Sequence, residues 1–81
     1  MDKDGLIQLI DKRFHEVNGG LNFEIIRDGV RQDGEWWYVP VIATRAGRDV
    51  PREVTVNIFA NIETEMEEEH NLTVLFIPAA A

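Results

Sequence analysis

The stretch from Leu21 to Thr44 most constrains this chain, because it reads as two apolar strands joined by the turn residues Gln32–Gly34. The turn can close as a two-residue Asp-Gly turn, or as a three-residue Gln-Asp-Gly loop in which Gly34 is left-handed. The three-residue loop pairs residues whose numbers add up to 66 and gathers apolar side chains on one face. The two-residue turn sets Trp37 beside polar residues such as Glu24. Since a one-residue slip moves every side chain to the opposite face, we predict the three-residue loop.

This loop gives the hairpin one apolar face and one mixed face. The apolar face carries Leu21, Phe23, Ile25, Trp37, Val39, Val41 and Ala43. The opposite face has more apolar and aromatic groups than a solvated surface needs, so we predict an interface there. Its residues are Ile26, Val30, Trp36, Tyr38 and Ile42. Pro40 lies among them without an N–H to donate, which predicts an edge strand or a break in the pairing. Arg27 and Arg31 are close enough in sequence to stack on Trp36.

A helix is predicted on the N-terminal side of the hairpin, over residues 3–18. Its apolar side chains recur at helical spacing and form one stripe. The stripe consists of Leu6, Ile10, Phe14 and Val17, widened by Ile7 and Leu9. Asp2 or Asp4 can cap its first turn, and Gly19–Gly20 can end it.

The period of the stretch after the hairpin is ambiguous. Apolar residues alternate over residues 52–59 as in a strand, but a stripe with a spacing of four also runs from Val50 through Val54, Ile58 and Ile62 to Met66. A strand would leave only a short helix with little to bury. We therefore predict one helix over residues 51–69, capped by Asp49 and followed by a C-cap at Asn71.

The apolar run Leu72–Ile77 predicts a last strand that ends at Pro78, with a disordered tail over residues 79–81. The order helix-strand-strand-helix-strand then predicts one α+β domain over residues 1–81, with a three-stranded mixed sheet and both helices on one face. A right-handed crossover makes the last strand parallel to the second. It can lie beside the second strand or beside the first. We favour the position beside the first strand, because it leaves Pro40 on an edge strand.

Charge and composition narrow the function. The 81-residue chain has a formal net charge of −7, and residues 49–81 contain only one basic residue, Arg52. An acidic chain of this kind repels phosphate backbones, so we expect no nucleic-acid partner. It contains no cysteine, which fits the cytoplasm, and no long apolar run that would suit a membrane.

Catalytic patterns are weak in this sequence. Cysteine and serine are both absent, and no histidine pair has a recognised ligand spacing. Glu63, Glu67 and His70 share one helix face and could bind a divalent cation in a hydrolase fragment, but the acidic run Glu63–Glu69 is more simply a solvated face. We therefore expect no enzyme, no cofactor and no metal site.

The sequence thus favours a non-enzymatic domain that binds a protein partner or itself, as a homodimer, through the outer sheet face. Burial of the exposed apolar patch would also add to the small core of a short chain. The alternative is an anion-binding or small-molecule-binding domain. It would use Arg45, Arg48 and Arg52 near the start of the second helix, where backbone N–H groups favour negative charge.

Overall fold

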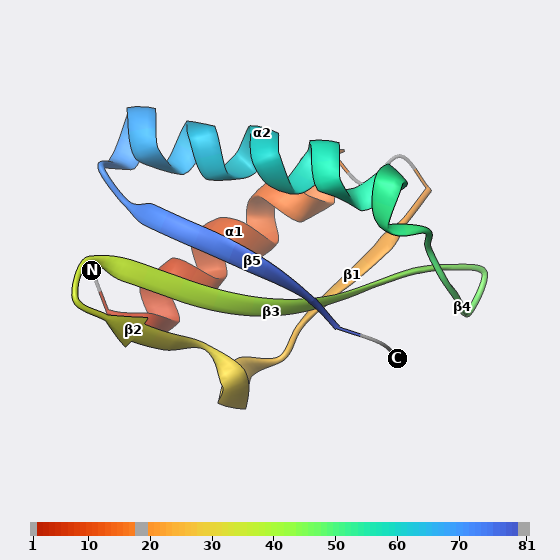
Figure 1. Cartoon of the computed structure of the whole chain (residues 1–81), viewed down its shortest axis with the longest axis horizontal. Coiled ribbons are helices and arrows are strands. Elements are labelled where there is room, and N and C mark those ends of the chain that lie inside the picture. The colour runs from red at the N-terminus through yellow and green to blue at the C-terminus, as the bar shows by residue number, and fades with distance from the viewer. Residues whose placement is uncertain (1, 18–19, 80–81) are drawn as a thin grey trace.

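A mixed five-stranded sheet forms one layer of the fold, and two helices form the other (Figure 1). The computed structural model describes residues 2–17 and 20–79. The elements are α1 (Lys3–Val17), β1 (Asn22–Ile25), the 3₁₀-helix η1 (Arg27–Gly29), β2 (Arg31–Asp33), β3 (Trp36–Arg45), β4 (Arg48–Asp49), α2 (Arg52–His70) and β5 (Thr73–Ala79). The α+β class predicted from the sequence is confirmed, but the sheet has more strands than the three predicted.

The helix α1 buries the predicted stripe and starts at a capped turn. Leu6, Ile10 and Phe14 are all buried in the core. The backbone N–H of Gly5 donates a 2.8 Å hydrogen bond to Oδ1 of Asp2, so Asp2 caps the helix. The predicted end at residue 18 and the glycine at position 19 lie outside the described residues.

The helix α2 confirms the helical interpretation of residues 52–59, but its buried face differs from the predicted stripe. The buried residues are Thr55, Phe59, Ile62 and Met66, whereas Val54 is exposed. A step of four residues turns a helix about 40° beyond a full circle, so a stripe with that spacing gradually leaves the buried face. The observed steps of four, three and four follow the face more closely.

The two ends of α2 test the predicted caps. The N-cap residue is Pro51, without a side-chain capping bond, and not Asp49. Asp49 belongs to β4 instead. At the other end Asn71 is the predicted C-cap, with a left-handed φ of 54° and an N–H that donates to the carbonyl of Glu67 at 3.2 Å.

The central strand of the sheet is β3. Ile42 pairs with Glu24 of β1 on one side and with Ala79 of β5 on the other. By the same reasoning, β2 lies on the same side of β3 as β1, and β4 lies on the same side of β3 as β5. The last strand is parallel to β3, as predicted, but it lies beside this second strand and not beside the first. Among the strands of the described residues, only β3 is long enough to pair along all seven residues of β5.

The hairpin has the predicted register at its open end and a different one at its turn. Paired residues of β1 and β3 add up to 66, but those of β2 and β3 add up to 69. The turn is therefore the two-residue Gly34–Glu35, with a φ of 62° at Gly34, and the predicted three-residue loop is wrong. The 3₁₀-helix η1 takes up the difference. As a result Val30, predicted on the outer face, lies in the core with 4% of its surface exposed.

Pro40 lies in the central strand, and the chain beside it explains how. The N–H of Ile26 donates to the Pro40 carbonyl at 3.0 Å, and the chain then leaves the ladder to form η1. The N–H that Pro40 lacks thus falls where the pairing is interrupted, so the predicted edge position is wrong and the predicted break is correct. Gly29 of η1 packs so tightly that an added Cβ would lie 2.7 Å from Cγ of Pro40.

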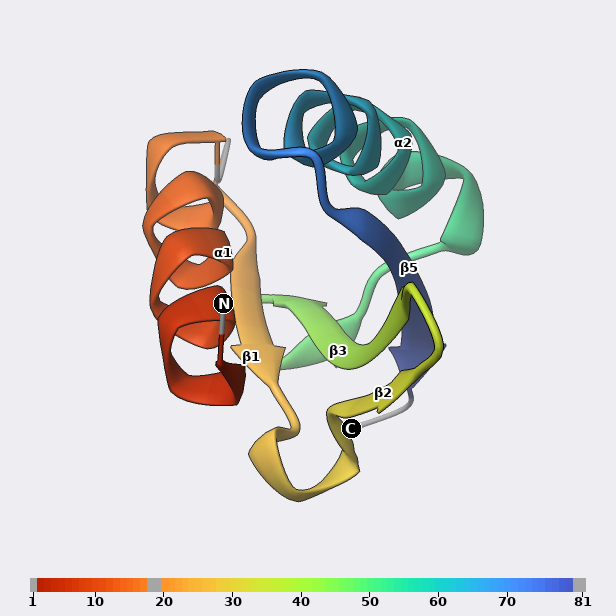
Figure 2. The same ribbon diagram turned by 90° about the vertical axis from the view of Figure 1, so that its left-hand side faces the viewer.

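Both helices cover the same face of the sheet, as predicted. Figure 2 looks along α2 and shows α1 beside β1, with β5 below α2. The side chains of α1 and α2 form one core with those of β3 and β5 that point toward the helices, including Trp37, Val39, Val41, Val74 and Phe76. The rings of Phe14 and Phe23 stack at a centroid distance of 4.5 Å. Ala79, predicted in a disordered tail, ends β5, and residues 80–81 lie outside the described part of the chain.

Candidate functional site

The face of the sheet away from α1 and α2 carries a group of apolar and aromatic side chains on neighbouring strands, which we call the outer patch. It consists of Ile26, Trp36, Tyr38, Pro40, Ile42, Leu75 and Ile77. Trp36 is 47% exposed, Leu75 40% and Ile77 38%, and the other members are partly buried. Large apolar side chains gathered in this way on one surface are typical of an interaction site.

The pairing of β3 with β5 places the outward side chains of the two strands next to each other in the outer patch. In the parallel pair, Tyr38 lies beside Leu75 and Pro40 lies beside Ile77. From the sequence, either set of alternate residues in the last strand could face outward. The structure places Thr73, Leu75 and Ile77 outside and buries Val74 and Phe76. Pairing of β5 with β3 was the missing information, because a run without alternation does not indicate its own outer face.

Four of the five predicted interface residues lie on the outer face. Ile26, Trp36, Tyr38 and Ile42 are there, and Val30 is the exception described above. The alternation of residues predicted the two faces of β3 correctly, because that strand is regular along its whole length. It failed at Val30 because η1 shifts the register just before this residue.

Charged side chains border the outer patch along β1 and β2. Arg31 lies opposite Tyr38, Asp33 opposite Trp36, and Glu24 opposite Ile42. The guanidinium carbon of Arg31 lies 5.2 Å from the centroid of the Tyr38 ring, a cation–π distance. The predicted stacking of an arginine on Trp36 is therefore wrong, because the pairing of β2 brings Arg31 to the next outward ring.

Both edges of the sheet resist further strand pairing. On the free edge of β5, the N–H of Phe76 donates a 2.8 Å hydrogen bond to Oε2 of Glu63 from α2. Pro78 on the same strand has no N–H to offer. On the opposite edge η1 interrupts the strand between Ile25 and Arg31. Edges blocked in this way disfavour strand addition, so the face of the sheet is the more available surface.

The predicted anion site is only partly assembled. Arg45 lies opposite Arg48 in the β3–β4 hairpin, and both are exposed. Arg52 starts α2 and lines a different feature, a hollow of about 220 Å³ at the end of the parallel strands. Apolar side chains of β3, α2 and β5 form most of its wall, and Asp49 also contributes. A carboxylate at this position opposes the binding of an anion.

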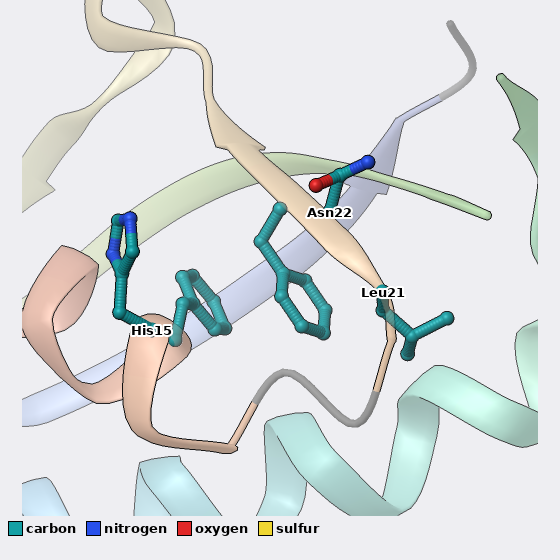
Figure 3. Close-up of a pocket in the computed structure, with 5 residues that line it drawn as sticks. His15, Leu21 and Asn22 are labelled. Atoms are coloured by element: carbon teal, nitrogen blue, oxygen red, sulfur yellow. The ribbon is translucent and has the colours of Figure 1, made fainter. Parts of the chain in front are cut away.

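A smaller hollow of about 80 Å³ lies between α1 and β1. His15 of α1 and Asn22 of β1 line it together with Leu21 (Figure 3). The stacked rings of Phe14 and Phe23 complete its lining. Nδ1 of His15 lies 2.8 Å from the backbone carbonyl of Asp11. Its volume is well below the few hundred Å³ of a typical small-molecule site.

The acidic face of α2 has structural contacts that the sequence did not indicate. Glu63 is engaged with the backbone of β5, as described above. Both side-chain oxygens of Glu65 accept hydrogen bonds from Arg13 of α1, one of them at 2.9 Å. The alternative of a metal site at Glu63, Glu67 and His70 gains no support, because no group of three metal-ligating side chains that could hold an ion occurs within residues 2–17 and 20–79.

Comparisons of the chain with protein-family models, with curated proteins and with solved structures find no match. Within the described ranges, neither α1 nor α2 is long and apolar enough to cross a membrane.

Proposed function

We propose that this chain is a non-enzymatic cytoplasmic domain that binds protein through the outer patch. The observation that carries the proposal is the exposure of Trp36, Leu75 and Ile77 on adjacent strands of one sheet face. Burial of apolar surface contributes roughly 25 cal/mol per Å². A partner that covers these side chains therefore gains affinity without any rearrangement of the fold.

The composition of the outer patch supports binding of a protein. Tryptophan, tyrosine and arginine are the residues most often found at the energetic centres of protein interfaces. Here Trp36 and Tyr38 stand two residues apart on β3, and Arg31 is stacked on Tyr38. Rings and guanidinium groups already held in place lose little conformational freedom on binding.

Site-specific photo-crosslinking tests this proposal. A photoreactive phenylalanine analogue is introduced at Trp36, and in a matched variant at Val56 on the exposed side of α2. The two positions are comparably accessible, at 47% and 51%. In cells that express the variants, we expect protein adducts from position 36 and far fewer from position 56. Equal yields from both positions, or none from position 36, would contradict the proposal.

A second candidate is the binding of a small anion at the hollow of about 220 Å³, and one observation favours it. Arg52 lines this hollow at the first turn of α2, where backbone N–H groups attract negative charge. Phosphate or sulfate would then raise the melting temperature of the protein, and Arg52→Ala would abolish the rise. The absence of a rise across a series of anions rules out this candidate.

A further inference from the structure

The charged residues beside the outer patch are arranged evenly about Pro40. Arg31 lies opposite Tyr38, which is two residues before Pro40, and Glu24 lies opposite Ile42, which is two residues after it. Four residues of a strand span about 13 Å. A cation and a carboxylate thus stand at equal distances on either side of the Pro40 level, along the same edge of the patch.

We infer that the outer patch binds a second copy of this chain, sheet against sheet, about a two-fold axis that crosses the strands at Pro40 and Ile77. This inference rests on the proposed function and names its partner. Rotation about such an axis brings the residue two positions before Pro40 in one copy opposite the residue two positions after Pro40 in the other. Arg31 of each copy then faces Glu24 of the other, and two ion pairs close one side of the interface.

The apolar contacts of this dimer follow from the same rotation. Tyr38 faces Ile42 of the second copy, and Ile77, which lies beside Pro40 in the sheet, faces its own equivalent. Sheets that pack face to face lie about 10 Å apart with their strands nearly aligned. An isologous contact of this kind covers both outer patches at once and forms a closed dimer.

Other positions of the axis are less favourable. An axis at the level of Tyr38 sets Arg31 against Arg31 of the second copy, and an axis at the level of Ile42 sets Glu24 against Glu24. Halfway between Tyr38 and Pro40, it sets Asp33 against Glu24. An axis parallel to the strands places Arg31 over apolar Leu75 of β5. An axis halfway between Trp36 and Tyr38 pairs Arg31 with Asp33, but it sets Pro40, Ile42 and Ile77 beyond the ends of the opposing strands. The axis at Pro40 pairs opposite charges and also keeps these side chains within the interface, and charge complementarity of this kind selects the register of an interface.

The inference is tested by charge exchange, with the dimer dissociation constant measured by sedimentation equilibrium. Arg31→Glu and Glu24→Arg, made separately, each turn two attractive pairs into repulsive ones, and we expect each to raise the dissociation constant about tenfold. The double variant restores opposite charges across the interface and recovers most of the affinity. Lys12→Glu is the matched control, because Lys12 is exposed on α1, which covers the opposite face of the sheet.

The position of the axis is tested by chemical crosslinking. The chain has no cysteine, so Ile77→Cys introduces a single thiol close to the axis and Thr73→Cys a single thiol far from it. A short bis-maleimide should link two copies of Ile77→Cys efficiently and two copies of Thr73→Cys hardly at all. Equal linking of both variants overturns the proposed axis.

The failure of this inference is distinguishable from the failure of the proposed function. If the unmodified chain sediments as a monomer at every concentration, the second copy is excluded as the partner. Photo-crosslinks from position 36 to a different protein would still support binding through the outer patch. If Trp36→Glu dissociates a dimer that the charge exchanges leave unchanged, the outer patch is the interface but the proposed axis is wrong.

Discussion

The two faces of β3 are both largely apolar and each carries one tryptophan, but their environments are opposite. Trp37 is 6% exposed and Trp36 is 47% exposed, although they are neighbours on one regular strand. The side chains of α1 and α2 pack on the side of Trp37, whereas neither of these α-helices covers the side of Trp36. Burial is thus decided by where the helices pack, while hydrophobicity is shared by the two faces. An apolar face that the fold leaves uncovered is the part that can serve binding.

Alanine substitution at the two tryptophans tests this contrast and has the largest expected effect. Trp37→Ala leaves a cavity in the core, and we expect it to lower the free energy of unfolding by about 3–5 kcal/mol. Trp36→Ala removes a half-exposed ring. We expect a loss of less than about 1 kcal/mol when the protein is diluted below the dissociation constant of any dimer. Urea denaturation measures both values, and similar losses at the two positions would remove the distinction between the faces.

The contact between Gly29 and Pro40 extends the comparison to the edge of the sheet. A Cβ at position 29 would lie 2.7 Å from Cγ of Pro40, in the strand that both faces share. Because η1 must move away to accept it, we expect Gly29→Ala to cost about 1–3 kcal/mol of folding stability. The same denaturation experiment measures this cost.

A double-mutant cycle shows whether the cost arises at the proline ring. In a Pro40→Ala background the atom that would be struck is absent, so Gly29→Ala should be much less destabilising there. An additive cycle, with the full cost in both backgrounds, means that η1 does not pack on Pro40 as described.

Regular parts of the chain could be predicted from the sequence, because their periodicity depends on local geometry. The stripe that contains Leu6, Ile10 and Phe14 is buried as predicted, and the alternation on β3 placed Trp36 outward and Trp37 inward. The predicted pairing of β1 with β3, in which paired residue numbers add up to 66, is also correct. That success was partly fortunate, since it followed from a turn of the wrong length.

Departures from regularity could not be predicted, because each depends on contacts between distant residues. The 3₁₀-helix η1 shifts the register by three residues, and its signal is only a proline on the other strand, Pro40. The outward set of β5 depends on which strand it joins. Glu63 appeared to be one more member of an acidic run, yet its carboxylate binds a backbone N–H of β5 thirteen residues away.

The contact between Glu63 and Phe76 distinguishes the blocked edge from the open face, and it has the next largest expected effect. Glu63→Ala leaves the N–H of Phe76 without its carboxylate acceptor. We expect the variant to lose about 1–2 kcal/mol of stability. Hydrogen exchange should show faster exchange of the Phe76 amide. Glu67→Ala, one turn further along α2, is the control and should leave that amide unchanged. Unaltered exchange in Glu63→Ala means that the carboxylate does not protect the edge.

The smallest expected effect concerns the ion pair that joins the two helices over the inner face. Arg13 donates to both oxygens of Glu65, and this interaction, chiefly through its hydrogen bond, raises the pKa of the guanidinium above its ordinary value despite some desolvation. Partly exposed ion pairs contribute only about 0.2–1 kcal/mol to stability. Because Glu16→Ala removes the pair of Arg13 with Glu16 but leaves its pair with Glu65, we expect Arg13→Ala to cost about 0.2–1 kcal/mol more than Glu16→Ala. A cycle with Glu65→Ala isolates the pair, and added salt should reduce its coupling energy. A coupling several times larger would mean that the helix layer is held together by charge as well as by the core. In that case, the contrast between the two faces would depend on electrostatics as well as on packing.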